Sequence, residues 1–107
     1  RMLANLTKLK MFRIMHNNLR FIEKNSFRLN SDLVRLYLSY NKIESFSVGN
    51  MENLEQVHLT YNKQLKRINL KNLEKLEVLS LRWTGLSNLS SEAFQNLSNL
   101  REMHLTG

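Results

Sequence analysis

A spacing of apolar residues that recurs along the chain constrains its fold more than any other feature. The segment from Leu76 to Leu100 follows the order L-x-x-L-x-L-x-x-T-x-L-x-x-L, and then adds one phenylalanine and two more leucines. It keeps neither the 3.6-residue period of an amphipathic helix nor the two-residue period of a long strand. Its L-x-x-L-x-L core predicts one short strand, Leu79 to Leu81, after which the chain must wrap around a common interior.

The same pattern is found along the rest of the chain. Copies start at positions 9, 33, 54, 76 and 100, so successive steps are 24, 21, 22 and 24 residues. Chance registration of so many copies is not credible. We therefore predict a single array over residues 1–107, with the tail of one repeat at 1–8, four repeats from the starts given above and a truncated one from position 100.

This pattern resembles that of the leucine-rich repeat family, L-x-x-L-x-L-x-x-N/C-x-L in units of 20–29 residues. The resemblance implies an α/β solenoid, a horseshoe with a concave parallel β-sheet and an irregular convex side. The uneven repeat lengths are most similar to the extracellular animal type. Solenoids need capping units at their ends. Neither end of this sequence has one, which predicts a central slice of a longer array.

Asparagine stands at the ninth position of three repeats, as Asn17, Asn41 and Asn62. The backbone turns out of the strand at this point and leaves buried N–H and C=O groups without partners. A carboxamide supplies both donors and an acceptor, so stacked copies are expected to form a structural ladder. Thr84 stands at the same position in the next repeat and offers only a hydroxyl, so we expect it to lose part of the ladder bonding.

The residues between the strand leucines form columns across the predicted sheet, and one column is aromatic. His16, Tyr40, Tyr61 and Trp83 are expected side by side, and these residue types are enriched in interface hot spots. An alternative interpretation, compatible with the first, is that the rings pack on one another to cover the strand ends. The predicted partner-binding residues are Arg13, His16, Tyr37, Tyr40, His58, Tyr61, Arg82 and Trp83.

The chain is strongly basic, which indicates either an acidic partner or simply a solvated surface rich in lysine. The net charge is +7, from 16 basic and 9 acidic residues, which favours a partner with an acidic surface. Nucleic acid is not the expected partner, because no nucleic-acid module motif occurs and the columns mix glutamate with arginine. There is no cysteine nucleophile, glycine-rich phosphate loop or paired-carboxylate motif, so we expect no enzyme activity and no cofactor. His58 and His104 share a column but stand two strands apart, which is too far to share a metal ion.

Three N-x-S/T sequons, at Asn5, Asn88 and Asn96, are candidate glycosylation sites. By resemblance, modules of this kind serve as receptor ectodomains, adhesion proteins or secreted immune-recognition proteins, and some form homo- or hetero-dimers. An extracellular or cell-surface location is the expectation. No run of about 18 apolar residues occurs, so no membrane insertion is expected within this segment. The alternatives are an intracellular scaffold and a basic binder of polyanions such as glycans or nucleic acid.

Overall fold

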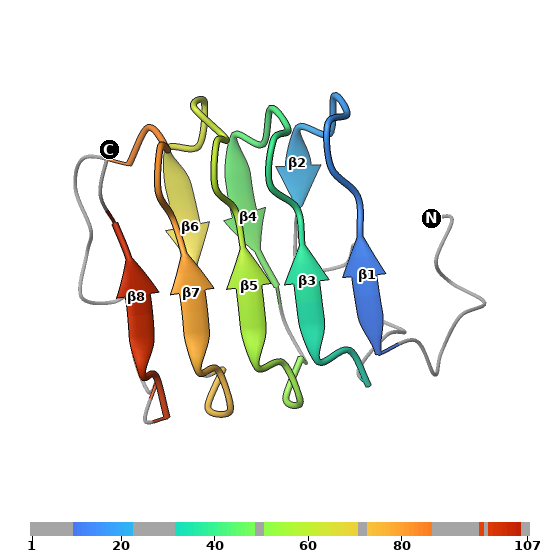
Figure 1. Cartoon of the computed structure of the whole chain (residues 1–107), viewed down its shortest axis with the longest axis vertical. Helices are drawn as coiled ribbons and strands as arrows, with labels where there is room; N and C mark the ends of the chain where they lie inside the picture. The colour runs from blue at the N-terminus through green and yellow to red at the C-terminus, as the bar shows by residue number, and fades with distance from the viewer. Residues whose placement is uncertain are drawn as a thin grey trace.

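The computed structural model describes residues 10–22, 32–48, 51–70, 73–86, 97 and 99–105. Within these residues the chain forms short strands and turns, and no helix (Figure 1). The strands are β1 (Met11–Arg13), β2 (Phe21–Ile22), β3 (Arg35–Tyr37), β4 (Ser45–Ser47), β5 (Gln56–His58), β6 (Arg67–Asn69), β7 (Val78–Ser80) and β8 (Glu102–His104).

The larger sheet takes one strand from each turn of the coil. It has five parallel strands in the order β1-β3-β5-β7-β8 (Figure 1). Leu36 pairs with Val57, and Val57 with Leu79, so the apolar residue of each strand faces the core in the same row. The strand register is the one that the alignment of repeats predicts, and the prediction of a solenoid with a parallel sheet is confirmed.

The predicted strand Leu79–Leu81 lies one residue earlier, at Val78–Ser80. The backbone N–H groups of Glu77 and Val78 both donate to the carbonyl of Glu55, one residue before the facing strand, so hydrogen bonding to that strand is already established at Val78. The hydrogen bonding then continues past the strand, since the Leu81 N–H donates to the carbonyl of His104 at 2.8 Å.

A second sheet follows the turn out of the first, in a part of the coil where the sequence predicted irregular backbone. It has three parallel strands in the order β2-β4-β6. Ile22 pairs with Phe46, and Phe46 pairs with Ile68 on its other side. Ile22 and Phe46 are buried. Each strand alternates an inward apolar residue with outward neighbours, but over so few residues that the alternation is not recognisable in the sequence.

The core lies inside the coil, and leucines from every turn fill it. Leu36, Leu59 and Leu79 are completely buried, and burying a side chain of this kind contributes about 1.5–3 kcal/mol. Where the structure describes the start of a repeat in full, a tight bend leads the chain onto this core. The N–H of Leu54 donates to the carbonyl of Met51 at 3.1 Å, and that of Leu76 to Leu73 at 3.0 Å. Leu54 and Leu76, the leading leucines of their repeats, are therefore fixed by both burial and a closed turn.

Candidate binding surface

The strand ends of the larger sheet are held by side-chain amides. Asn41 donates from Nδ2 to the carbonyl of Leu38 in its own repeat and to that of Ile14 in the preceding one, each at 2.9 Å. Its Oδ1 accepts from the backbone N–H of Asn17 at 3.2 Å. Asn17 is itself exposed, and its amide donates to the carbonyl of Met15 at 2.9 Å.

Asn62 repeats this arrangement one turn further along. Its amide donates to Leu59 at 2.8 Å and to Leu38 at 3.1 Å, and its Oδ1 accepts from the N–H of Ile43 at 3.0 Å. Thr84 donates to Leu81 of its own repeat at 2.9 Å. A hydroxyl has one proton, so Thr84 cannot donate to the preceding repeat as well. The inter-repeat bond to the carbonyl of Leu59 is thus missing at this position.

The residue before each ladder position has a left-handed backbone. The φ angles are 59° at His16, 60° at Tyr40, 62° at Tyr61 and 59° at Trp83. This conformation is uncommon outside glycine, asparagine and aspartate, and it costs an L-residue about 1–2 kcal/mol. The turn out of the strand requires it, yet the chain places its largest side chains there.

These four side chains form one continuous stack, which we call the aromatic ledge. Ring centroids are 4.7 Å apart for His16 and Tyr40, 4.8 Å for Tyr40 and Tyr61, and 5.7 Å for Tyr61 and Trp83. The backbone fixes this spacing. The N–H of Tyr40 donates to Thr60 and that of Tyr61 to Arg82, so the strand pairing, at about 4.8 Å, extends under the rings.

The ledge is exposed as well as stacked. Tyr40 is 41% and Trp83 45% exposed, although each contacts a neighbouring ring. Rings that stack by their faces leave their edges to solvent. The two interpretations of this column, a structural stack and a binding surface, are therefore both compatible with the geometry.

A second row of side chains runs parallel to the ledge across the middle of the sheet. The guanidinium of Arg13 lies 4.5 Å from the ring centroid of Tyr37, and Tyr37 stacks on His58 at 4.8 Å. Nε2 of His58 is 3.1 Å from Oε1 of Gln56. Burial lowers the pKa of His58 below its ordinary value of 6.5, and the nearby His104 and Arg13 lower it further. A neutral His58 is therefore favoured in the folded protein.

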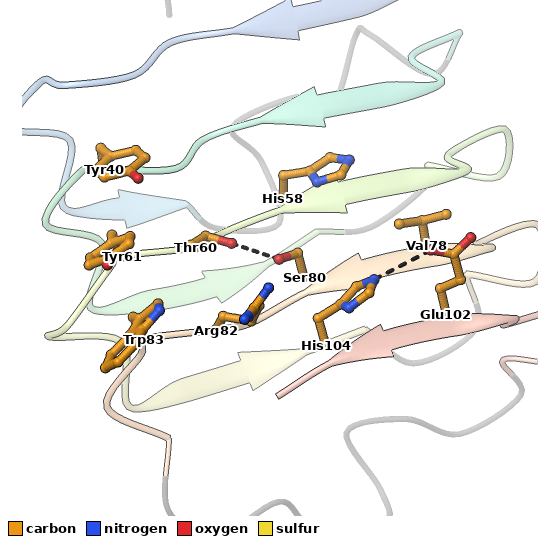
Figure 2. Close-up of a pocket in the computed structure, with 10 residues that line it drawn as sticks. All are labelled: Tyr40, His58, Thr60, Tyr61, Val78, Ser80, Arg82, Trp83, Glu102 and His104. Atoms are coloured by element: carbon orange, nitrogen blue, oxygen red, sulfur yellow. Dashed lines mark hydrogen bonds and ion pairs between the residues drawn. The ribbon is translucent and has the colours of Figure 1, made fainter. Parts of the chain in front are cut away.

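A shallow, open groove of about 480 Å³ lies between these two rows (Figure 2). Its floor is the pair Thr60 and Ser80, whose hydroxyl oxygens are 2.6 Å apart and share a hydrogen bond. In Figure 2, the ledge stands on one side of this pair and the imidazoles of His58 and His104 on the other. The groove is lined by Tyr40, His58, Thr60, Tyr61, Val78, Ser80, Arg82, Trp83, Glu102 and His104.

Five of the predicted partner-binding residues line this groove: Tyr40, His58, Tyr61, Arg82 and Trp83. Arg13, His16 and Tyr37 do not line it but continue the same two rows onto β1 and β3. The other five lining residues, which were not among the predicted ones, are Thr60, Val78, Ser80, Glu102 and His104. For Ser80 the signal is a small side chain between two histidines, His58 and His104, in the same column of the sheet. The sequons at Asn5, Asn88 and Asn96 lie outside the described residues.

A basic flank lies beyond the ladder, at Arg20, Lys42, Lys63, Lys66 and Arg67, all exposed. It is partly compensated, because Nε and Nη2 of Arg20 donate to one carboxylate oxygen of Glu44, at 2.9 and 2.6 Å. The described residues include no group of histidines and carboxylates able to hold a metal ion. No helix that could cross a membrane is found in the part of the chain that the structure describes.

Comparison with known families agrees with the fold. Residues 7–63 match the family described as "Leucine rich repeat", and residues 75–97 match a second profile with the description "Leucine Rich Repeat". The chain therefore belongs to the leucine-rich repeat family. Domains of this family generally mediate protein binding and are generally not enzymes. No curated protein and no solved structure matches the chain significantly.

Proposed function

We propose that this chain is a non-catalytic protein-binding module whose partner docks on the larger sheet and against the aromatic ledge. The observation that carries the proposal is the left-handed backbone under Tyr40, Tyr61 and Trp83. Asparagine or glycine would satisfy this turn without strain. Bulky rings at these positions need a reason beyond the turn itself, and strained residues gather at functional sites.

Stacking offsets part of the strain. Each aromatic pair contributes about 0.5–1.5 kcal/mol, which roughly balances the cost of one left-handed residue. The ledge therefore adds little net stability, while it presents tyrosine and tryptophan, the residue types that dominate interface energetics. A partner that covers the exposed edges of Tyr40 and Trp83 would gain the free energy of burying these rings on binding.

The rigidity of the larger sheet also favours its use as a protein-binding surface. The ledge and the middle row stand on a sheet whose strands are paired and whose ends are held by Asn41 and Asn62. Binding to such a surface orders few groups, so little of the interaction energy is lost to conformational entropy.

We further propose an extracellular or cell-surface setting, in a receptor, an adhesion protein or a secreted immune-recognition protein of the extracellular animal type. The uneven repeat steps of 24, 21, 22 and 24 residues and the sequons at Asn5, Asn88 and Asn96 support it. Secretion from animal cells followed by intact-mass measurement before and after glycosidase treatment tests this setting. Fully unmodified asparagines would favour the alternative, an intracellular scaffold of the same fold.

The binding proposal is tested by immobilising the chain and comparing the proteins it retains from secreted and cell-surface fractions. The ledge variant is Tyr61→Asn with Trp83→Asn. The matched control is Phe21→Ser, because Phe21 is 46% exposed but lies on the second sheet. Proteins retained by the wild type and by the control should be lost by the ledge variant. If the folded ledge variant retains the same proteins with the same affinity, the proposal is wrong.

A further inference from the structure

We infer that the groove beside the ledge receives an acidic side chain of the protein partner, with its carboxylate over the Thr60–Ser80 pair and an adjoining apolar side chain against Trp83. This inference rests on the proposed function, because it specifies the partner of the same surface. It goes further by giving the chemistry of the contact and the residues that make it.

Side-chain size creates the groove. Ser80 lies between His58 and His104 in the strand register, and Thr60 stands beside it toward the ledge. Small hydroxyl residues are thus surrounded by large rings, and the hollow of about 480 Å³ follows. This volume falls within the range of about 300–1,000 Å³ that is usual for ligand pockets. A protruding side chain of a partner can therefore enter between the two rows.

Hydrogen-bond donors predominate in the groove. Thr60 and Ser80 carry two hydroxyl protons between them, and their mutual bond uses one, so the other remains for an incoming acceptor. Arg82 adds guanidinium donors. The one carboxylate in the lining, Glu102, lies 3.3 Å from Nε2 of His104. An anionic acceptor fits this set better than a cation or a neutral amide.

The charge distribution on the sheet favours a discrete carboxylate over a long polyanion. The amino-terminal ends of the strands carry both signs of charge, with Glu55 and Glu77 beside Arg35 and Arg101. The carboxyl ends carry arginines, with Arg13 at the end of β1 and Arg82 beyond β7. A sulfated glycan or nucleic-acid strand running along the strands would meet these carboxylates. An acidic protein segment needs only the carboxyl-terminal half, where the aromatic rings also lie.

The single tryptophan makes the site directly observable. Trp83 is the only tryptophan of the chain, so its fluorescence reports on the groove alone. Three short capped peptides, identical except for glutamate, glutamine or lysine beside phenylalanine, serve as probes. The glutamate peptide should change Trp83 fluorescence with a Kd about tenfold lower than the glutamine peptide, as expected for a charge-assisted hydrogen bond. The lysine peptide should bind most weakly.

Two variants test the residues. Ser80→Leu fills the floor and leaves the ledge in place, and Arg82→Gln removes the guanidinium. Either change should abolish the preference for glutamate, whereas the control Arg67→Gln, an exposed cation on the second sheet, should keep it. Far-ultraviolet circular dichroism of each variant verifies that the fold is retained.

The outcomes separate this inference from the proposed function. Equal affinity for the glutamate and glutamine peptides, or an unchanged preference in the Arg82→Gln variant, overturns the acidic-side-chain inference. Tighter binding of a heparin fragment, with affinity falling steeply as salt rises, overturns it in favour of a polyanion. In either case a captured protein that still requires Tyr61 and Trp83 leaves the proposed function standing.

Discussion

The backbone carbonyl of Lys63 lies so close to Gly85 that a β-carbon at position 85 would stand 2.6 Å from its oxygen. The carbonyl oxygen of Leu65 would lie 3.0 Å from the same β-carbon. The cause is the extra residue in the third repeat, which has two residues between Asn62 and Leu65 where the second repeat has one between Asn41 and Ile43. The longer turn bulges toward the next repeat, which accommodates it with a glycine.

Replacing Gly85 with alanine should therefore destabilise the array. The obstructing atoms are backbone oxygens that cannot rotate away, so we expect a loss of about 1–3 kcal/mol in the free energy of unfolding. Gly85 does not have a left-handed backbone, so close approach is the cause. Denaturant unfolding of wild type and Gly85→Ala measures the loss.

Removal of Gln64 provides the control for this explanation, since it restores the shorter turn of the other repeats. In the background lacking Gln64, the Gly85→Ala change should cost clearly less than in the wild type. Equal costs in both backgrounds would show that the bulge is not what excludes the β-carbon.

Thr84→Asn should stabilise the chain by about 1 kcal/mol. The new amide can donate to Leu81, as the threonine does now, and also to Leu59 of the preceding repeat, which is the bond that Asn62 makes to Leu38. The midpoint of thermal unfolding measures the gain. The reverse change, Asn62→Thr, should cost about 1–3 kcal/mol because it leaves the buried N–H of Ile43 without its acceptor. A Thr84→Asn variant no more stable than wild type would contradict the ladder explanation.

Trp83→Asn should leave the free energy of unfolding within about 1 kcal/mol of wild type. Asparagine relieves the left-handed strain, about 1–2 kcal/mol, while the stack loses its contact with Tyr61, about 0.5–1.5 kcal/mol. Leu81→Ala, at a core position two residues away, should cost about 2–5 kcal/mol in the same measurement. If the two variants were equally unstable, the ledge would be chiefly a structural element.

His58 should make stability depend on pH. Its pKa is lowered in the folded protein, so the unfolded chain binds the proton more readily. Its contribution to stability is therefore complete above pH 6.5, the ordinary pKa, and is lost as the pH falls below that value. His58→Phe keeps a ring on Tyr37 but cannot be protonated. Between pH 7.5 and 5.5 wild type should lose more stability than this variant, as followed by denaturant unfolding. Parallel losses would contradict the prediction.

The spacing of leucines was sufficient to predict the coil, the larger sheet and the row in which each of its side chains lies. This works because a parallel register of repeats is fixed by burial: a shift of one residue would turn Leu36 or Leu79 outward. The second sheet was not predictable in the same way. Strands as short as Phe21–Ile22 carry no periodic signal, and their pairing depends on the adjacent turns of the coil.

The groove was harder to predict than the ledge. Aromatic residues at equivalent positions are evident in the sequence, but a hollow depends on what stands between large side chains, and Ser80 and Thr60 are unremarkable in themselves. The left-handed backbone of Tyr40 and Tyr61 could not be predicted from the sequence either, because tyrosine does not favour this conformation. Only the geometry of the turn shows that their rings are held there at a cost.

The two sheets have a mechanical consequence for recognition. Within the described residues, successive turns are joined along β1-β3-β5 and again along β2-β4-β6, so each of these turns is hydrogen-bonded to its neighbour in two places (Figure 1). Turns that are hydrogen-bonded in both sheets cannot twist or separate from each other without breaking backbone hydrogen bonds. We therefore expect this stretch to be rigid, so a partner must be complementary in shape to the surface as it stands.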